Sequence, residues 1–109
     1  MPNVLRITRL VSRPTMGPAL VSRCMEIAER ERTTNPGAYT VVQARRLLDG
    51  DRIEVVSLTR WLDLDAMLRY VPPTADPEQP PFYDEYATAV ESWSVDLFEL
   101  TWTTEDGAL

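Results

Sequence analysis

The chain begins with a run of β-branched and apolar residues, after which apolar residues recur with a longer period. The stretch VLRITRLVS, Val4 to Ser12, is rich in β-branched and apolar residues and stops before Pro14, which predicts a β-strand. From Thr15 to about Thr33, apolar residues recur at the spacing of one helical face. We therefore predict a strand followed by an amphipathic helix. The apolar face of that helix consists of Met16, Leu20, Val21, Cys24, Met25, Ile27 and Ala28.

Two further strand-like runs flank a turn signal. The runs are Tyr39 to Leu48 and Arg52 to Trp61, and the residues between them read DGD, Asp49 to Asp51. An Asp-Gly pair between apolar runs is typical of a β-hairpin, because glycine readily adopts the left-handed backbone of a tight turn. We predict that these two strands are antiparallel neighbours.

A short helix is expected directly after the third strand. Asp63 can cap a helix with its carboxylate, Asp65 lies in the first turn, and Pro72 and Pro73 prevent the helix from continuing. The next segment, residues 72–81, holds five of the nine prolines and is predicted to be an extended loop. This loop is either a spacer or a lid, and the spacer is the simpler interpretation.

The remaining part of the chain predicts one more helix and one more strand. Behind Pro81, aromatic and apolar residues recur at helical spacing, namely Tyr83, Tyr86, Val90 and Trp93. The run SVDLFELTW, Ser94 to Trp102, predicts a final strand. Residues 103–109 are expected to form a solvated tail.

The order of these elements predicts a known arrangement. A strand, a helix, a hairpin, an interrupted helical segment and a strand fold with right-handed crossovers into a ferredoxin-like split βαβ sandwich. Its sheet has four antiparallel strands, with helices on one face. With 109 residues, the chain is predicted to be one α+β domain, residues 1–109, with a core from about 4 to 102.

Both faces of this sheet are predicted to need burial. A sheet with one wet face shows clean alternation, but the first strand has Leu5 and Ile7 on one side and Leu10 on the other. The third strand likewise has Ile53 opposed by Val56. Because one chain supplies helices for one face only, we infer a homodimer whose sheets pack face to face.

The composition excludes several kinds of chemistry. All eleven basic residues are arginine, so the chain has no histidine base, no histidine ligand for metal or haem, and no Schiff-base lysine. The single Cys24 cannot form an internal disulfide, and its helical setting favours buried filler over a nucleophile. No acidic residues have the spacing of a metal site or a carboxylate pair. We expect no bound metal or cofactor.

Charge and hydropathy limit the partners. A net charge of −6 argues against nucleic-acid binding, which usually requires a basic face. No apolar run is long enough to span a bilayer, and the N-terminus lacks the pattern of a signal peptide. A cytoplasmic protein without a membrane or nucleic-acid partner is expected.

The succession IEVVSLTRWLDLDAMLRYV, in which a strand ends in a tryptophan and an acidic-capped helix follows, resembles the antibiotic biosynthesis monooxygenase domain of the dimeric α/β-barrel superfamily. The resemblance in element order covers Val4 to Trp102. It implies a dimeric barrel with a cleft between sheet and helices that binds a small aromatic molecule. Some members oxidise polycyclic phenols with O₂ and no metal or flavin, and others open haem.

The resemblance disfavours haem degradation. Haem-degrading members use an asparagine on the first strand, a tryptophan in the helix after the third strand and a histidine ligand. Here Thr8 and Tyr70 stand at the first two positions, and histidine is missing. The cofactor-free members hold a phenolic substrate with Asn, Trp, Tyr and Arg side chains. The resemblance thereby implies as ligand-binding candidates Trp61, Tyr70, Tyr83, Tyr86, Arg6 and Arg45.

Each candidate also has a structural interpretation. Trp61 at a strand end can pack the following helix, and Tyr83 and Tyr86 can form the core face of theirs. Tyr70 can pack its ring while its hydroxyl faces a cavity. The strand arginines, among them Arg6 and Arg45, can pair across strands with glutamates, whereas one without an ion pair that faces a cleft would anchor an anion.

Two functions remain open from the sequence. The first is a cofactor-independent monooxygenase-like enzyme for a small aromatic or polyketide-like compound. The second is a non-catalytic dimeric barrel that binds a small molecule or serves as an assembly module. The missing histidine and lysine favour the second, and the family resemblance favours the first.

Overall fold

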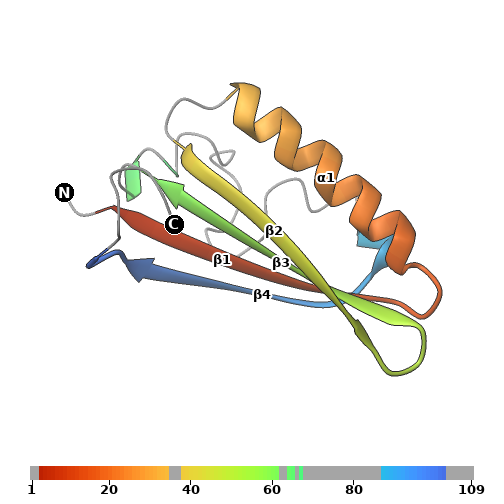
Figure 1. Ribbon diagram of the computed structural model, residues 1–109. Coiled ribbons are helices and arrows are strands. Elements are labelled where there is room, and N and C mark those ends of the chain that lie inside the picture. The colour runs from red at the N-terminus through yellow and green to blue at the C-terminus, as the bar shows by residue number, and fades with distance from the viewer. Residues whose placement is uncertain (1–2, 35–37, 62–63, 66, 68–86, 103–109) are drawn as a thin grey trace.

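The structure, a computed structural model, describes residues 3–34, 38–61, 64–65, 67 and 87–102. The predicted strands at the N-terminus and around the hairpin are confirmed, and the helix is found between them (Figure 1). In chain order the elements are β1 (Val4–Ser12), α1 (Gly17–Thr34), β2 (Ala38–Leu48), β3 (Arg52–Trp61), the 3₁₀ turn η2 (Ala87–Ala89) and β4 (Val90–Glu99).

The strands form one four-stranded sheet in the order β2-β3-β1-β4, and every neighbouring pair is antiparallel. β1 and β2 are joined by α1 and lie on either side of β3, which is the split βαβ connection. Figure 1 shows α1 lying across one face of the sheet. The predicted ferredoxin-like α+β fold is therefore confirmed, and we call the face covered by α1 the helix-facing side.

The core lies between α1 and the centre of the sheet. Leu20, Cys24 and Ile27 are buried on α1 at the predicted helical spacing. They form one cluster with strand and turn residues, namely Leu10, Ile53, Val55, Ala89 and Val90. Met16 and Val21 pack at the edge of this cluster. Burial of this apolar face is what stabilises the helix on the sheet.

The N-terminus of α1 approaches β3 so closely that only glycine fits. A Cβ atom on Gly17 would lie 2.5 Å from Cγ1 of Ile53. The helix also begins two residues later than expected, because Thr15 has a left-handed backbone with φ of 67°. The Thr15 N–H donates to the Asp51 carbonyl at 3.0 Å, so a contact with the hairpin decides where the helix starts.

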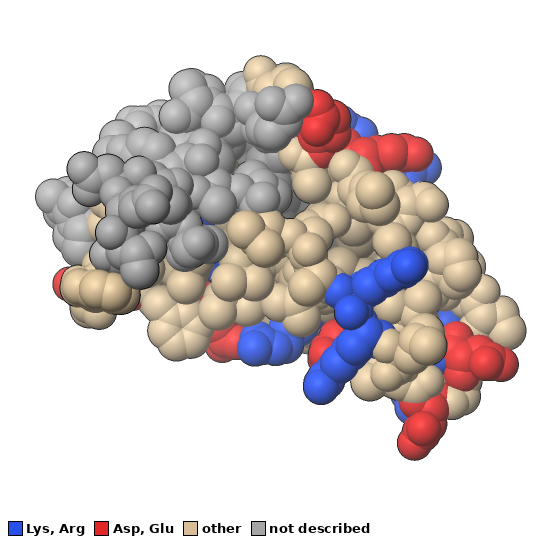
Figure 2. Space-filling model, viewed as in Figure 1, with Lys and Arg blue, Asp and Glu red and all other residues tan. Residues whose placement is uncertain are grey.

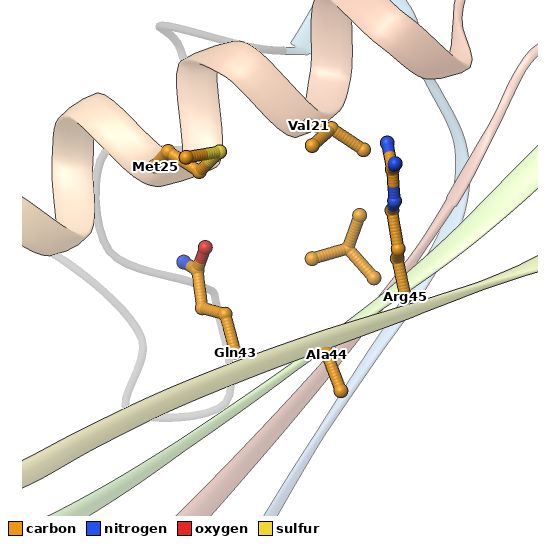
Figure 3. A pocket seen from close by; sticks show the side chains of 6 residues that line it. Val21, Met25, Gln43, Ala44 and Arg45 are labelled. Atoms are coloured by element: carbon orange, nitrogen blue, oxygen red, sulfur yellow. The ribbon is translucent and has the colours of Figure 1, made fainter.

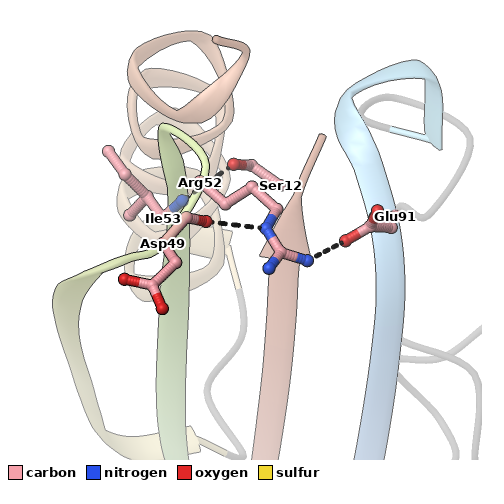
Figure 4. A network of polar contacts seen from close by, with 5 residues as sticks. All are labelled: Ser12, Asp49, Arg52, Ile53 and Glu91. Atoms are coloured by element: carbon pink, nitrogen blue, oxygen red, sulfur yellow. Dashed lines mark hydrogen bonds and ion pairs between the residues drawn. The ribbon is translucent and has the colours of Figure 1, made fainter. Parts of the chain in front are cut away.

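The hairpin turn has the predicted position and the left-handed backbone expected of a tight turn. Gly50 and Asp51 have positive φ values of 75° and 58°. Arg52 holds this turn, donating from Nε to the Asp49 carbonyl at 3.0 Å and from Nη1 to Glu91 of β4 at 2.7 Å (Figure 4). The ion pair reaches past the end of β1, where a bulge interrupts the pairing with β4.

Ser12 continues the β1–β3 contact where the regular pairing stops. The Ser12 side chain is fully buried, and its hydroxyl oxygen accepts a hydrogen bond from the Ile53 N–H at 2.9 Å (Figure 4). A buried backbone N–H group without an acceptor destabilises the fold. The Ser12 hydroxyl therefore accepts the bond that a backbone carbonyl would accept in regular strand pairing.

The start of the last strand differs from the sequence prediction. β4 begins at Val90 rather than Ser94 and ends at Glu99 rather than Trp102. Val90 and Trp93, assigned to a helix by their spacing, are strand residues that pair with β1, Trp93 opposite Leu10. β1 offers hydrogen-bonding groups along its whole length, and pairing with them outweighs a weak helical period.

Several predicted features lie outside the described residues. These are the proline-rich loop 72–81, most of the helix expected behind Pro81 and the tail 103–109. Of the short helix expected after Trp61, the structure describes Leu64, Asp65 and Met67, and all three are helical.

The sheet face turned away from α1 carries an apolar surface, which we call the open face. Leu5, Ile7 and Val11 of β1 lie on it beside Val56 and Leu58 of β3, and all five are half-buried. Val42 and Phe98 on the outer strands are 40% and 51% exposed. Both faces therefore carry apolar residues, as the lack of clean alternation along the strands predicted. Among the described elements, no helix is long and apolar enough to cross a membrane.

Candidate functional site

A row of polar side chains is buried on the helix-facing side of the two central strands. Arg6 and Thr8 of β1 and Thr59 of β3 are 2%, 8% and 6% exposed. Arg6 lies opposite Thr59, and Trp61 follows on the same face of β3 with no exposed surface. Two of the predicted ligand residues, Arg6 and Trp61, are thus on one protected surface.

Arg6 is the most unusual member of this row. Charged side chains are rarely buried, because removing a guanidinium from water costs several kcal/mol unless polar or anionic groups surround it. Alternation along β1 places Arg6 on the same face as Leu10, so the strand itself aims the side chain away from the open face. Its planar fork of N–H donors suits an oxygen anion and cannot act as an acid or a base at neutral pH.

Arg45 lies elsewhere on the helix-facing side. It belongs to the edge strand β2, opposite Val55, and its side chain is exposed. A cavity of about 440 Å³ separates this part of β2 from α1, and Figure 3 shows Val21 and Met25 above it and Gln43 and Arg45 rising from the strand. Gln43 Nε2 donates to the Cys24 carbonyl at 2.9 Å, which fixes β2 to the helix.

Ion pairs between strand arginines and acidic residues of neighbouring strands are present, as predicted, although the predicted partner Glu54 binds an arginine that was not among the candidates. Glu54 accepts from Arg46 at 2.6 Å, and Arg9 lies 3.9 Å from Asp96. Arg60 instead donates to the side-chain carbonyl of Asn3 at 2.8 Å.

The three tyrosine candidates, Tyr70, Tyr83 and Tyr86, lie outside the described residues and stay predictions. Sequence reasoning missed the partners of Arg45 in the cavity, Gln43 and Met25. A signal for Gln43 was present: it stands two positions before Arg45, on the strand face that should be apolar.

Neither a metal centre nor a reactive thiol is found in the part of the chain that the structure describes. No group of three His, Cys, Asp or Glu side chains there could hold a metal ion. Burial raises the pKa of the Cys24 thiol from 9.0 to about 11, which makes the reactive thiolate even rarer at neutral pH than for an exposed thiol. Cys24 is therefore a core residue, as its helical position predicted.

The raised pKa of Cys24 predicts a loss of stability at high pH. The folded thiol keeps its proton up to pH of about 11, whereas the unfolded thiol loses it above about 9. The contribution of the protonated thiol to the free energy of unfolding is fully present below pH 9 and is lost as the pH rises to 11. The loss is about 3 kcal/mol, since each pKa unit corresponds to roughly 1.4 kcal/mol. Urea unfolding of the protein and of Cys24→Ala across this range measures the difference. Equal pH dependence of the two proteins would contradict the assignment.

Comparison with known proteins gives matches in structure alone. No protein-family model and no curated protein sequence matches the chain. A solved structure of a proposed antibiotic biosynthesis monooxygenase from Deinococcus radiodurans superposes with a TM-score of 0.69 at 15% identity, covering 94% of this chain and 96% of that one. A mutant of SnoaB, a cofactor-independent oxygenase from Streptomyces nogalater, has a TM-score of 0.63 at 20% identity, covering 95% and 98%.

A third similar structure adds an assembly state. It is a dimeric protein of unknown function and ferredoxin-like fold from Bacteroides fragilis, with a TM-score of 0.69 at 14% identity, covering 90% of this chain and 96% of that one. Identities this low establish similarity of fold. The chain therefore has the ferredoxin-like fold seen in proteins described as antibiotic biosynthesis monooxygenases, over nearly its whole length.

Proposed function

We propose that this protein is a cytosolic, cofactor-independent monooxygenase-like enzyme that acts on a small aromatic or polyketide-like compound between the helix-facing side of the sheet and its helices. The observation that carries the proposal is the buried Arg6, on the same protected strand face as Trp61. A buried guanidinium on the same sheet face as an indole offers a charge for an anionic oxygen and a flat apolar surface for a ring. The fold shared with a cofactor-independent oxygenase supports this assignment.

The proposed chemistry needs no external electron donor. A phenol with an acidified ring methylene loses a proton to give an anion, and that anion transfers electrons to O₂. One oxygen atom becomes the carbonyl oxygen that replaces the two methylene hydrogens, and the other leaves as water. Arg6 would stabilise the anion electrostatically and Trp61 would orient the ring, both in a site that excludes water. The substrate supplies the reducing equivalents, so the protein contributes orientation and charge.

We propose that the protein works as a homodimer formed through the open face. That face has an apolar centre that includes Ile7, Val56 and Leu58, in a sheet whose helix lies on the other side. Nearby charges are already paired within the chain, Arg46 with Glu54 and Arg9 with Asp96. An apolar centre bordered by satisfied charges is the usual composition of a subunit interface. The dimeric state of the similar Bacteroides fragilis protein agrees with this proposal.

The second candidate is a non-catalytic dimeric barrel that binds a small molecule or serves as an assembly module. Two observations favour it. The chain contains no histidine or lysine, and its only thiol, Cys24, is held protonated in the core. Most side chains that transfer protons near neutral pH are thus missing.

Oxygen uptake separates the two candidates. We would mix the protein with a panel of polycyclic phenols that carry an activated methylene, in the presence of EDTA, and follow O₂ with an electrode and binding by tryptophan fluorescence. Arg6→Met removes the charge and keeps a side chain of similar length, and urea unfolding shows whether the variant is folded. It should lower turnover about 100-fold, the typical effect of removing a group that stabilises a transition-state anion. Arg23→Met, which changes an exposed arginine on α1, is the matched control.

The outcomes are distinct. Uptake of one O₂ per product, lost in Arg6→Met and kept in Arg23→Met, supports the enzyme. Binding without O₂ uptake would assign the protein to the second candidate. A panel that neither binds nor reacts would count against both a phenolic substrate and the site around Arg6.

A further inference from the structure

The cavity between α1 and β2 has the size and lining of a small-molecule site. It measures about 440 Å³, a size typical of small-molecule sites. Val21 and Met25 of α1 form one wall, and Val55 of β3 contributes to the lining. Met25 is 62% exposed although it lies on the apolar side of the helix. An exposed methionine at a cavity is a flexible, polarizable surface that adapts to an apolar ligand.

Arg45 supplies the charge of this cavity. Three other arginines of the sheet, Arg9, Arg46 and Arg52, each have a carboxylate partner. Arg45 has neither an ion pair nor a hydrogen bond within the described part of the chain. Figure 2 shows arginine side chains (blue) standing over β2 on a surface that is otherwise largely uncharged. Among the described residues, Arg45 differs from these three in having no carboxylate partner, although the chain carries a net charge of −6.

We propose that this cavity binds a small carboxylic acid with an apolar body, such as a medium-length acyl chain. The carboxylate would pair with the guanidinium of Arg45, whose fork of N–H groups can donate to both oxygens at once. The apolar body would lie along Val21 and Met25, in the space that Figure 3 shows between helix and strand. Gln43, the polar neighbour of Arg45 in this cavity, is a neutral amide that donates to the Cys24 carbonyl, so it offers Arg45 no negative charge that would compete with a carboxylate.

This site is separate from the one around Arg6. Arg45 is level with Val55 of β3, and Arg6 is level with Thr59, four residues further along the same strand. At about 3.3 Å per residue the two rows are roughly 13 Å apart along the sheet. Arg45 is also on the edge strand, whereas Arg6 is on a central one. The acid would therefore be an additional ligand and not the substrate of the proposed reaction.

Calorimetric titration with octanoate, below its micelle concentration, tests the site. Octanamide has the same apolar body without the charge and serves as the neutral probe. Arg45→Gln should weaken octanoate binding about ten- to a hundredfold, the range expected for losing a charged hydrogen-bonding partner. Met25→Glu should abolish it by placing a competing carboxylate in the cavity. Arg46→Gln is the matched control, since Arg46 is the next residue and is already paired with Glu54.

The expected result is octanoate binding that octanamide does not match, that weakens in Arg45→Gln and Met25→Glu, and that is unchanged in Arg46→Gln. Three outcomes would overturn the proposal: no octanoate binding, equal binding of octanamide, or equal losses in Arg45→Gln and Arg46→Gln. None of these variants changes Arg6 or Trp61, so failure here leaves the oxygen-uptake experiment unaffected.

Discussion

Replacing Leu58 by glutamate is expected to convert the proposed homodimer into a monomer. Leu58 lies on the open face, opposite Ile7 of β1 and Val42 of β2, at the centre of the apolar surface. A carboxylate buried there without a partner costs several kcal/mol, which corresponds to at least about a hundredfold weaker dimer. Light scattering coupled to size-exclusion chromatography at micromolar concentration gives the mass of each protein.

The control for this change is Leu47→Glu. Leu47 belongs to the exposed edge strand β2, and it is 82% exposed and lies on the helix-facing side. The same chemical change there should leave the mass at that of the dimer. A monomeric wild-type protein, or a Leu58→Glu variant that stays dimeric, would show that the open face is not the interface.

Replacing Trp61 by alanine is expected to lower the free energy of unfolding by about 3–5 kcal/mol. Trp61 is the largest of the side chains with almost no exposed surface, and it ends β3 beside Val4 and Ala38. Removing it leaves a large cavity that the sheet cannot close. Small domains are stabilised by only about 5–15 kcal/mol in total, so urea unfolding should detect the loss easily.

Trp102→Ala is the matched control, because Trp102 is 77% exposed beyond the end of β4. The same substitution there should change stability by less than about 0.5 kcal/mol. If Trp61→Ala were as stable as Trp102→Ala but lost ligand binding, Trp61 would serve the site and not the core. A loss of both would mean that one side chain packs the strand end and also forms the site surface.

Much of the fold was predictable because its signals are local. β1 and β3 have the predicted limits, Val4–Ser12 and Arg52–Trp61, since runs of β-branched and apolar residues and their turn signals are readable along the chain. The hairpin was predictable from Gly50, whose positive φ the turn requires. The start of β4 was not, because the pairing of Trp93 with Leu10 joins residues far apart in the sequence. The predicted start of α1 was wrong for the same reason, because the hydrogen bond from Thr15 to Asp51 joins residues far apart in the sequence.

The candidate site was predictable in its residue types but not in its arrangement. Arg6, Trp61 and Arg45 were named together from a family resemblance, and the structure places Arg45 on a different strand and row from the other two. The pairing register of the strands puts all three on the helix-facing side. The sequence does not say which of them tertiary packing covers, and in the structure Arg6 is buried whereas Arg45 is exposed beside a cavity.

The sequence by itself determined β1, β3, the position of the hairpin and the two apolar faces of the sheet, because residue type and period act within a few positions. It also determined which chemistry is missing, since absent histidine and lysine cannot be supplied by folding. Only the tertiary structure decided which arginines are buried, which are exposed and which form ion pairs. The ion pair of Arg52 with Glu91 crosses the sheet, and the burial of Arg6 depends on what packs over β1. These are contacts between distant segments, and their energies depend on geometry that no local pattern records.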